Sequence, residues 1–351
     1  MRSKTNNVHS SETLLNNAVD KDFQELFKPL YILTIMFCLR KYELYDNFVT
    51  PITKRDFIRR VLALIIVYLL FFFTLKHFAT IFEGPMVYVM YFITYLQYAV
   101  NYNILSLMNI FEGKLNVDIL LNLCSINKSL RNSHDSKKVR VLVWFATSVL
   151  IVVYCILISL KLWLDPMWNW SRVIFIMLTL SFDLELIYII FITYFLACKT
   201  NTWRRTLKTK RINTDEKKKN IKVEKDLKEL LSIYEMILNA LDLTKKASRW
   251  VVESVVISSH MFGVILWVFK SFLAETALCA SCEVLYRRLS AAEVEVILYV
   301  ARFKKNIFRL NDTRLEKLSP WGIFSVDAGL PLRMGAFLAN YIIVLLQFAF
   351  L

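Results

Sequence analysis

Long apolar runs alternate with charged segments along this chain, and the runs have the length of membrane helices. About 20 consecutive apolar residues suffice for a helix to cross the hydrocarbon core of a bilayer. Six such runs are predicted to be spans, namely residues 58–78, 85–108, 139–162, 173–197, 251–273 and 329–351. A shorter apolar stretch at 26–39 is too brief to cross and predicts a re-entrant or interfacial helix. The pattern predicts an all-α integral membrane protein.

These runs divide the chain into segments of distinct character. The basic segment between the fourth and fifth runs has apolar residues at helical spacing, among them Leu227, Leu230, Tyr234 and Leu238. It predicts an amphipathic cytoplasmic helix that packs with neighbouring subunits or touches anionic lipid. The predicted organisation is a cytoplasmic N-terminal segment (1–57), four spans (58–197), a basic helical extension (198–250), a fifth span with the remnant of a sixth (251–290), a cytoplasmic segment (291–328) and a C-terminal helix (329–351).

Lys and Arg residues set the predicted orientation, because they concentrate in cytoplasmic loops. Basic residues before the first span, such as Arg40 and Lys41, Arg60 at its beginning, and others throughout 199–250 place the N-terminus inside. Five crossings would then leave residues 274–327 outside, although this segment carries many basic residues. One more crossing before Arg287 would resolve the conflict, so six to seven spans are predicted. With seven, the C-terminus is extracellular.

The composition narrows the function classes. Hydrophobic residues make up 56% of the chain, and the formal net charge is +15. The basic residues are unevenly spread between the apolar runs, which argues against nucleic-acid binding, since that function favours a basic soluble domain. The cysteines are scattered and do not suggest a disulfide framework, and no cleaved signal peptide is expected. Cys279 and Cys282 lack a nearby His, and no catalytic constellation is found, so neither a metal or other cofactor nor an enzymatic activity is predicted.

The last apolar run carries one polar stripe. Asn340, Val344 and Gln347 share a helical face because they are three and four residues apart. An amide inside hydrocarbon must face protein or water, so this helix is predicted to pack into a bundle or to line a pore. In a pore, amide carbonyls replace part of the hydration shell of a cation, while apolar rings at Val344 or Leu351 gate by dewetting. Hydrogen bonding between helices is the alternative.

Two other runs contain candidate ligand-binding residues. Tyr91, Tyr95 and Tyr98 lie on one face of the second run, where tyrosines suit either a pocket for a small molecule or helix packing. Carboxylates inside a span are costly and often functional. The fourth and fifth runs add Asp183, Glu185, Tyr188 and His260 as pocket candidates. The alternatives for the two acids are a pair with Lys270, another buried structural pair, or a protonated acid.

The C-terminal residues resemble the signature of insect gustatory receptors. In that family a Thr-Tyr pair is followed by five mostly apolar residues and a Gln-Phe pair near the C-terminus. Tyr341, Gln347 and Phe348 match this pattern, and Asn340 stands where the family usually has Thr. The resemblance implies a seven-transmembrane chemoreceptor of the plasma membrane that acts as a ligand-gated, non-selective cation channel. It also implies a homotetramer, or a hetero-oligomer with related receptors, anchored by cytoplasmic helices and gated by a small-molecule tastant.

The same resemblance locates the conflict in the crossing count. Phe262 and Gly263 look like the start of the family's fifth span, and Cys279 to Glu283 looks like the end of its sixth. By this comparison, the second half of the family's fifth span and the first half of its sixth span are absent from this chain. A shortened, non-functional receptor product is therefore one alternative, and a secondary transporter is the other. The sequence does not distinguish sugar, bitter, carbon dioxide and pheromone ligands.

Overall fold

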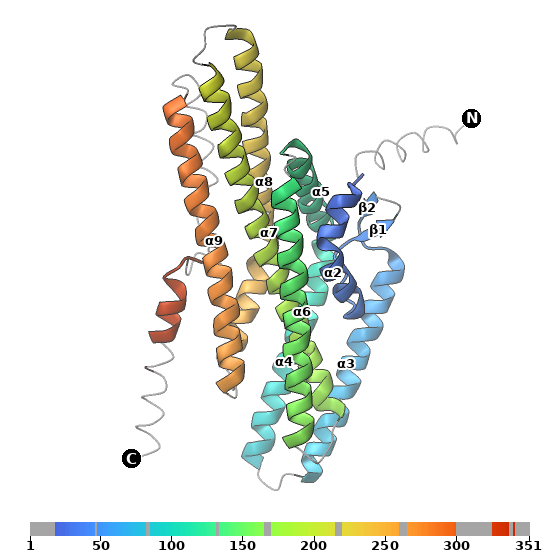
Figure 1. Ribbon diagram of the computed structural model, residues 1–351. Coiled ribbons are helices and arrows are strands. Elements are labelled where there is room, and N and C mark those ends of the chain that lie inside the picture. The colour runs from blue at the N-terminus through green and yellow to red at the C-terminus, as the bar shows by residue number, and fades with distance from the viewer. Residues whose placement is uncertain are drawn as a thin grey trace, which may run out of the picture. The chain divides into compact units, whose positions relative to one another are not determined.

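A computed structural model of the chain describes residues 18–45, 48–81, 85–130, 133–164, 170–214, 220–259, 265–299, 325–336 and 340. The fold is mostly helical (Figure 1). The helices are α2 (Lys21–Met36), α3 (Lys54–Ile81), α4 (Pro85–Phe111), α5 (Gly113–Ser129), α6 (Ser133–Leu164), α7 (Trp170–Thr214), α8 (Asn220–Ser259) and α9 (Ile265–Tyr299). Residues 330–336 are also helical. The chain divides into two compact units, the first made of residues 1–188 and 254–262 and the second of 189–253 and 263–351.

Three of the described helices are long and apolar enough to cross a membrane. Their apolar stretches are Arg55–Thr74 in α3, Lys137–Ile156 in α6 and Leu178–Thr209 in α7. They correspond to the first, third and fourth predicted spans, so the prediction of a helical protein with membrane-spanning segments is confirmed at this level. The second predicted span coincides with α4. The full count of six or seven crossings stays a prediction.

The apolar run at 251–273 is shared by two of the described helices. Its first part belongs to α8, which extends to Ser259, and its last part to α9, which begins at Ile265. Residues 260–264, between these two helices, lie outside the described residues, so the fifth predicted span stays a prediction.

In the first unit, α2 packs against α6. Its apolar face is buried at Phe23, Leu26, Phe27, Leu30 and Leu33, and an ion pair between Arg140 Nη1 and Glu25 Oε2 at 3.0 Å joins the two helices. The short helix predicted at 26–39 is thus present but begins earlier and ends at Met36.

Two elements of the first unit were not predicted. Strands β1 (Glu43–Tyr45) and β2 (Phe48–Thr50) form an antiparallel hairpin. The helix α5 lies between the second and third predicted spans, where no helix was predicted. Three-residue strands are too short to show a period of two, and the buried face of α5 includes the polar Asn116.

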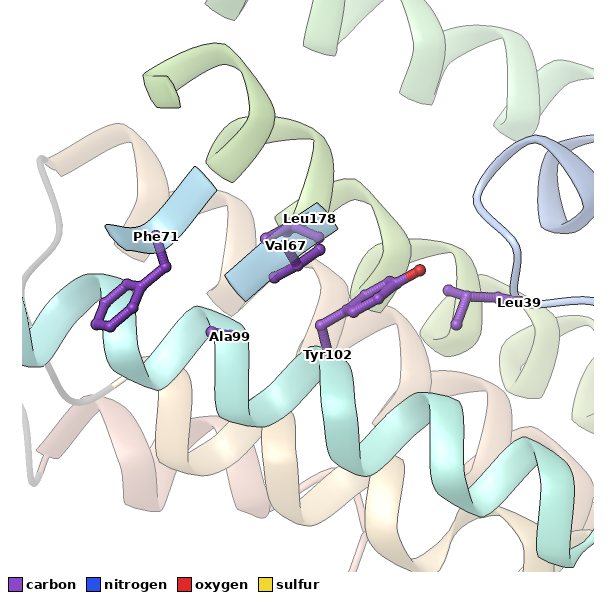
Figure 2. Close-up of a cluster of buried hydrophobic side chains, with 6 residues drawn as sticks. All are labelled: Leu39, Val67, Phe71, Ala99, Tyr102 and Leu178. Carbon is purple, nitrogen blue, oxygen red and sulfur yellow. The ribbon is translucent and has the colours of Figure 1, made fainter. Parts of the chain in front are cut away.

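A hydrophobic cluster joins three helices and the connection after α2. It comprises Leu39, Val67, Phe71, Ala99, Tyr102 and Leu178 (Figure 2). The small Ala99 lets α3 and α4 approach closely, and the Tyr102 hydroxyl donates a hydrogen bond to the carbonyl oxygen of Phe37 at 3.0 Å. This cluster fixes the start of the described part of α7 and the connection that carries Arg40 and Lys41.

In the second unit, an aromatic contact holds α8 against α7. The indole Nε1 of Trp203 donates to the carbonyl oxygen of Leu230 at 2.7 Å, and the Trp203 ring stacks on Tyr234 at 4.8 Å between centroids. Trp203 and Tyr234 are fully buried. The helix predicted from the apolar spacing between 227 and 238 is confirmed as part of α8.

Candidate functional site around Glu185

The buried carboxylate of Glu185 connects three segments of the first unit. Glu185 lies in α7 and is 1% exposed. Its Oε2 lies 2.5 Å from Nζ of Lys41, which follows α2, and its Oε1 accepts a hydrogen bond from Nδ2 of Asn109 in α4 at 3.0 Å. A buried charge is tolerated when it is paired and hydrogen-bonded. The ion pair therefore ties the connection after α2 to the middle of the chain.

An aromatic ring completes the surroundings of Lys41. Its Nζ lies 4.1 Å from the centroid of the Tyr188 ring, one helical turn from Glu185 on α7. A cation over an aromatic face is stabilised by the ring quadrupole, more strongly when water is excluded. Phe27 of α2 lies against the same ring at 6.4 Å between centroids. The Tyr188 hydroxyl is buried and has no hydrogen-bond partner among the described residues.

A second carboxyl group, that of Glu112, interacts electrostatically with both Lys41 and Glu185. Glu112 occupies the turn between α4 and α5 and is half-buried. Burial raises the pKa of the Glu112 carboxyl to about 7, Lys41 lowers it and the negative Glu185 raises it. Lys41 therefore stabilises the charged forms of two carboxyl groups: it forms an ion pair with Glu185 and acts on Glu112 electrostatically.

The backbone around Cys38 brings Lys41 into this position. Cys38 has a φ of 56°, a left-handed conformation that turns the chain sharply after α2. Arg60 of α3 then fastens the connection: its Nη2 donates to the carbonyl oxygen of Arg40, and its Nη1 donates to the carbonyl oxygen of Ser106 at 3.1 Å. The sequence pattern identified Arg40, Lys41 and Arg60 only as loop charges, whereas the structure buries Lys41 and Arg60.

Asp183 belongs to a separate contact. Its Oδ2 accepts a hydrogen bond from the Tyr154 hydroxyl of α6 at 2.5 Å. Residues two apart on a helix point in different directions, so Asp183 binds α6 while Glu185 binds Lys41. For Glu185 the structure agrees with the alternative of a buried structural pair, although the partner is Lys41 rather than Lys270.

For most of the other predicted site residues, either the residue or its side chain is outside the part of the chain that the structure describes. Tyr91, Tyr95 and Tyr98 lie in α4, but their side chains are not among those described, and His260 lies outside the described residues. Of the predicted pore face and family motif, Asn340 is helical and exposed, while Tyr341, Val344, Gln347, Phe348 and Leu351 are outside the described residues. The structure therefore brings together only Glu185 and Tyr188 from the predicted set.

Sequence reasoning missed Lys41, Asn109 and Glu112. A carboxylate inside an apolar run signals a buried cation or amide, but the partner of Glu185 lies far away along the chain, and many basic residues compete for the assignment. The site can hold helices in register and exchange a proton at Glu112. No group of side chains suited to a metal ion occurs within the described part of the chain.

No known protein family matches the chain, and no curated protein is significantly similar to it. The fold and the site define a mostly helical protein with three helices that could span a membrane. The resemblance to a particular family is confined to the sequence and is most specific in its C-terminal residues.

Proposed function

We propose that this chain is a chemoreceptor of the insect gustatory receptor type, a ligand-gated non-selective cation channel that detects a small-molecule tastant at the plasma membrane. The observation that carries the proposal is the motif of Tyr341, Gln347 and Phe348 within an apolar segment that has one polar face. The long apolar helices α3, α6 and α7 support it, because a channel of this type needs several membrane helices.

In this proposal the C-terminal helices of four subunits surround one pore. Asn340 and Gln347 then form two rings of amides, which replace part of a cation's hydration shell with little selectivity among monovalent ions. The exposure of Asn340 supports this arrangement, because an exposed amide on an apolar segment needs water or another subunit as its neighbour.

The ligand pocket is proposed near the tyrosine face of α4 and the Tyr188 region of α7. The Tyr188 hydroxyl is buried without a hydrogen-bond partner among the described residues. It can therefore donate a hydrogen bond to a ligand or accept one from it. Glu185 is occupied by Lys41 and Asn109, so we assign it a structural role beside the pocket. A ligand that binds the open state more tightly shifts the channel toward opening.

Current recordings test the pore. The full chain is expressed in oocytes, and currents are measured with panels of sugars, bitter compounds and dissolved carbon dioxide. A ring of four carboxylates favours divalent cations and increases their block, so Gln347→Glu is expected to raise the relative calcium permeability. The control is Gln24→Glu, the same change on α2. Unchanged selectivity in a Gln347→Glu channel that conducts would contradict the pore assignment.

The sidedness of the C-terminus separates a working receptor from a shortened product. A tag after Leu351 is stained in intact and in permeabilised cells, with a second surface label confirming delivery. Staining of intact cells is expected, because seven crossings place the last helix in the orientation of the proposed pore. Staining only after permeabilisation would mean an even number of crossings and an inverted last helix, and would favour the non-functional product.

A further inference from the structure

Three arginines surround a small cavity at the beginning of α3. Arg40, Arg59 and Arg60 line it together with Asp56, Ile35 and Cys38, and its volume is about 30 Å³. This space accepts a water molecule or one oxygen of a larger anion. Two arginines lie at its edge and one is buried, so positive charge reaches from the surface to the interior.

The acidic groups at the cavity do not occupy all of the arginine donors. Asp56 accepts from Nη1 of Arg40 at 3.2 Å and from Nη1 of Arg59 at 3.3 Å, and Glu43 lies 3.4 Å from Nη1 of Arg40. Each guanidinium has five N–H donors, and within the described residues the polar contacts of Arg40 and Arg59 to carboxylates use Nη1 alone. Two carboxylates against three guanidinium groups leave one positive charge in excess.

The buried arginine supplies an independent sign of a missing acceptor. Arg60 is 2% exposed, and its Nε has no hydrogen-bond partner among the described residues. Leaving a buried charged donor without an acceptor is costly. An anion at the cavity would reduce this cost and balance the excess charge.

The surface beside the cavity is apolar. The exposed side of α3 carries large hydrophobic residues along its length, including Phe57, Ile58, Leu62, Ile65, Leu69 and Phe73. This side belongs to an apolar stretch long enough to cross a membrane. Arg59 is half-exposed near the beginning of that stretch, and in a membrane this end of the helix would lie near the lipid phosphates. Basic residues at this end of the chain place it on the cytoplasmic side, where anionic lipids are abundant.

We propose that the Arg40–Arg59–Arg60 cavity binds the phosphate group of an anionic phospholipid from the cytoplasmic leaflet. Planar guanidinium groups bind phosphate through parallel N–H donors, which the unused edges of Arg40 and Arg59 supply. Asp56 holds these two side chains in place, and the acyl chains lie along the exposed apolar side of α3. A free phosphate ion has the same headgroup chemistry but gains nothing from that apolar side.

Native mass spectrometry of the full chain in detergent tests the proposal. The protein is titrated separately with phosphatidic acid, with phosphatidylcholine of the same acyl chains, and with inorganic phosphate. We expect retention of phosphatidic acid over the other two. Arg59→Gln is expected to lower that retention about tenfold, because it removes a charge-assisted contact. Lys137→Gln, which removes an exposed charge at the beginning of the apolar stretch in α6, should lower it by less than about twofold.

Three outcomes would overturn the proposal. Equal retention of phosphatidylcholine would show that the headgroup charge is not recognised. Equal losses in Arg59→Gln and Lys137→Gln would show a general charge effect, and inorganic phosphate bound as well as the lipid would show an ion site. If Arg59→Gln does not elute as the wild type does, Arg59→Lys replaces it. That variant keeps the charge but loses the planar donors, so an unchanged retention would also overturn the proposal. Neither result bears on the channel, whose pore test uses Gln347.

Discussion

The helices α3 and α7 both carry apolar stretches long enough to cross a membrane, yet they are buried to different extents. Only 22% of the apolar stretch of α3 is buried, against 78% of that of α7. The buried residues of α3 form one narrow face, comprising Asp56, Arg60, Val67, Phe71 and Thr74. Those of α7 lie on all sides of the helix, as expected for a central helix. Two helices that are both apolar enough to cross a membrane thus differ in their surroundings: α3 has one exposed side suited to lipid contact, and α7 is mostly buried in protein.

The buried polar residues of α3 and α7 also differ in where they lie along the apolar stretch. In α3 the buried polar groups lie near the beginning and end of the apolar stretch, whereas in α7 Ser181, Glu185 and Thr193 are buried within it. Ser181 and Thr193 donate to carbonyl oxygens of their own helix, but Glu185 needs partners from other segments. A central helix thus depends on specific polar partners, and a peripheral one depends on them less.

The largest difference in stability is expected between variants that remove one partner of an ion pair, at Lys41 beside α7 and at Arg59 on α3. Lys41→Met leaves Glu185 buried without its cation and should lower the free energy of unfolding by about 3–5 kcal/mol. Arg59→Met removes a half-exposed partner of Asp56 and should cost less than about 1 kcal/mol. Both are measured by denaturant titration in detergent. The double variant Lys41→Met/Glu185→Leu should recover most of the loss, and a double variant as unstable as Lys41→Met alone would contradict the pairing.

Leucine truncations compare the two helices directly. Leu196 of α7 is fully buried, whereas Leu69 of α3 is 52% exposed. Leu196→Ala should cost about 2–5 kcal/mol of unfolding free energy because it leaves a cavity, while Leu69→Ala should change it by less than about 0.5 kcal/mol. The two variants are measured side by side in the same detergent. Similar losses would mean that α3 is as enclosed as α7.

A smaller effect is expected at the contact between α7 and α8. Trp203→Phe keeps an aromatic ring against Tyr234 but removes the hydrogen bond to Leu230, so it should cost about 1 kcal/mol. The corresponding change on α3 is Thr74→Val, because the Thr74 hydroxyl donates to Leu70 within its own helix, and it should cost less than about 0.5 kcal/mol. Thermal unfolding monitored by circular dichroism measures both. A larger loss for Thr74→Val would reverse the comparison.

A further comparison concerns the dependence of stability on pH at Glu112. Its carboxyl group has a pKa raised to about 7 by burial, above the ordinary value of 4.5. The folded protein therefore binds this proton more tightly than the unfolded chain, and stability falls as pH rises from about 4.5 to about 7. Glu112→Gln should flatten the fall in melting temperature between pH 5 and pH 8, whereas Glu229→Gln, at an exposed position of α8, is the control. Parallel curves for Glu112→Gln and the wild type would contradict the raised pKa.

The long apolar runs predicted the beginnings of α3, α4, α6 and α7 to within six residues, because membrane-length runs leave little choice of secondary structure. They gave no sign of α5 or of the β1–β2 hairpin, whose short apolar patterns are stabilised by contacts distant along the chain.

The site was predictable only in part. Because burying a charge is costly, the predictions for Glu185 were a ligand pocket, a buried pair or a protonated acid. The structure gives it a partner, Lys41. Its identity did not follow, because Lys41 reaches Glu185 through the turn at Cys38 and the hold of Arg60 on the backbone of Arg40. Neither the turn at Cys38 nor the contact between Arg60 and Arg40 can be recognised from a sequence pattern.

The left-handed backbone of Cys38 also bears on engineering. A side chain with a Cβ costs about 1–2 kcal/mol in this conformation, a cost that glycine avoids. Natural chains are seldom at their stability optimum, and Cys38→Gly would relieve the strain while leaving every bond of Lys41 and Arg60 in place. Position 38 is therefore a starting point for a thermostabilised variant, the form in which membrane proteins are most readily purified and crystallised.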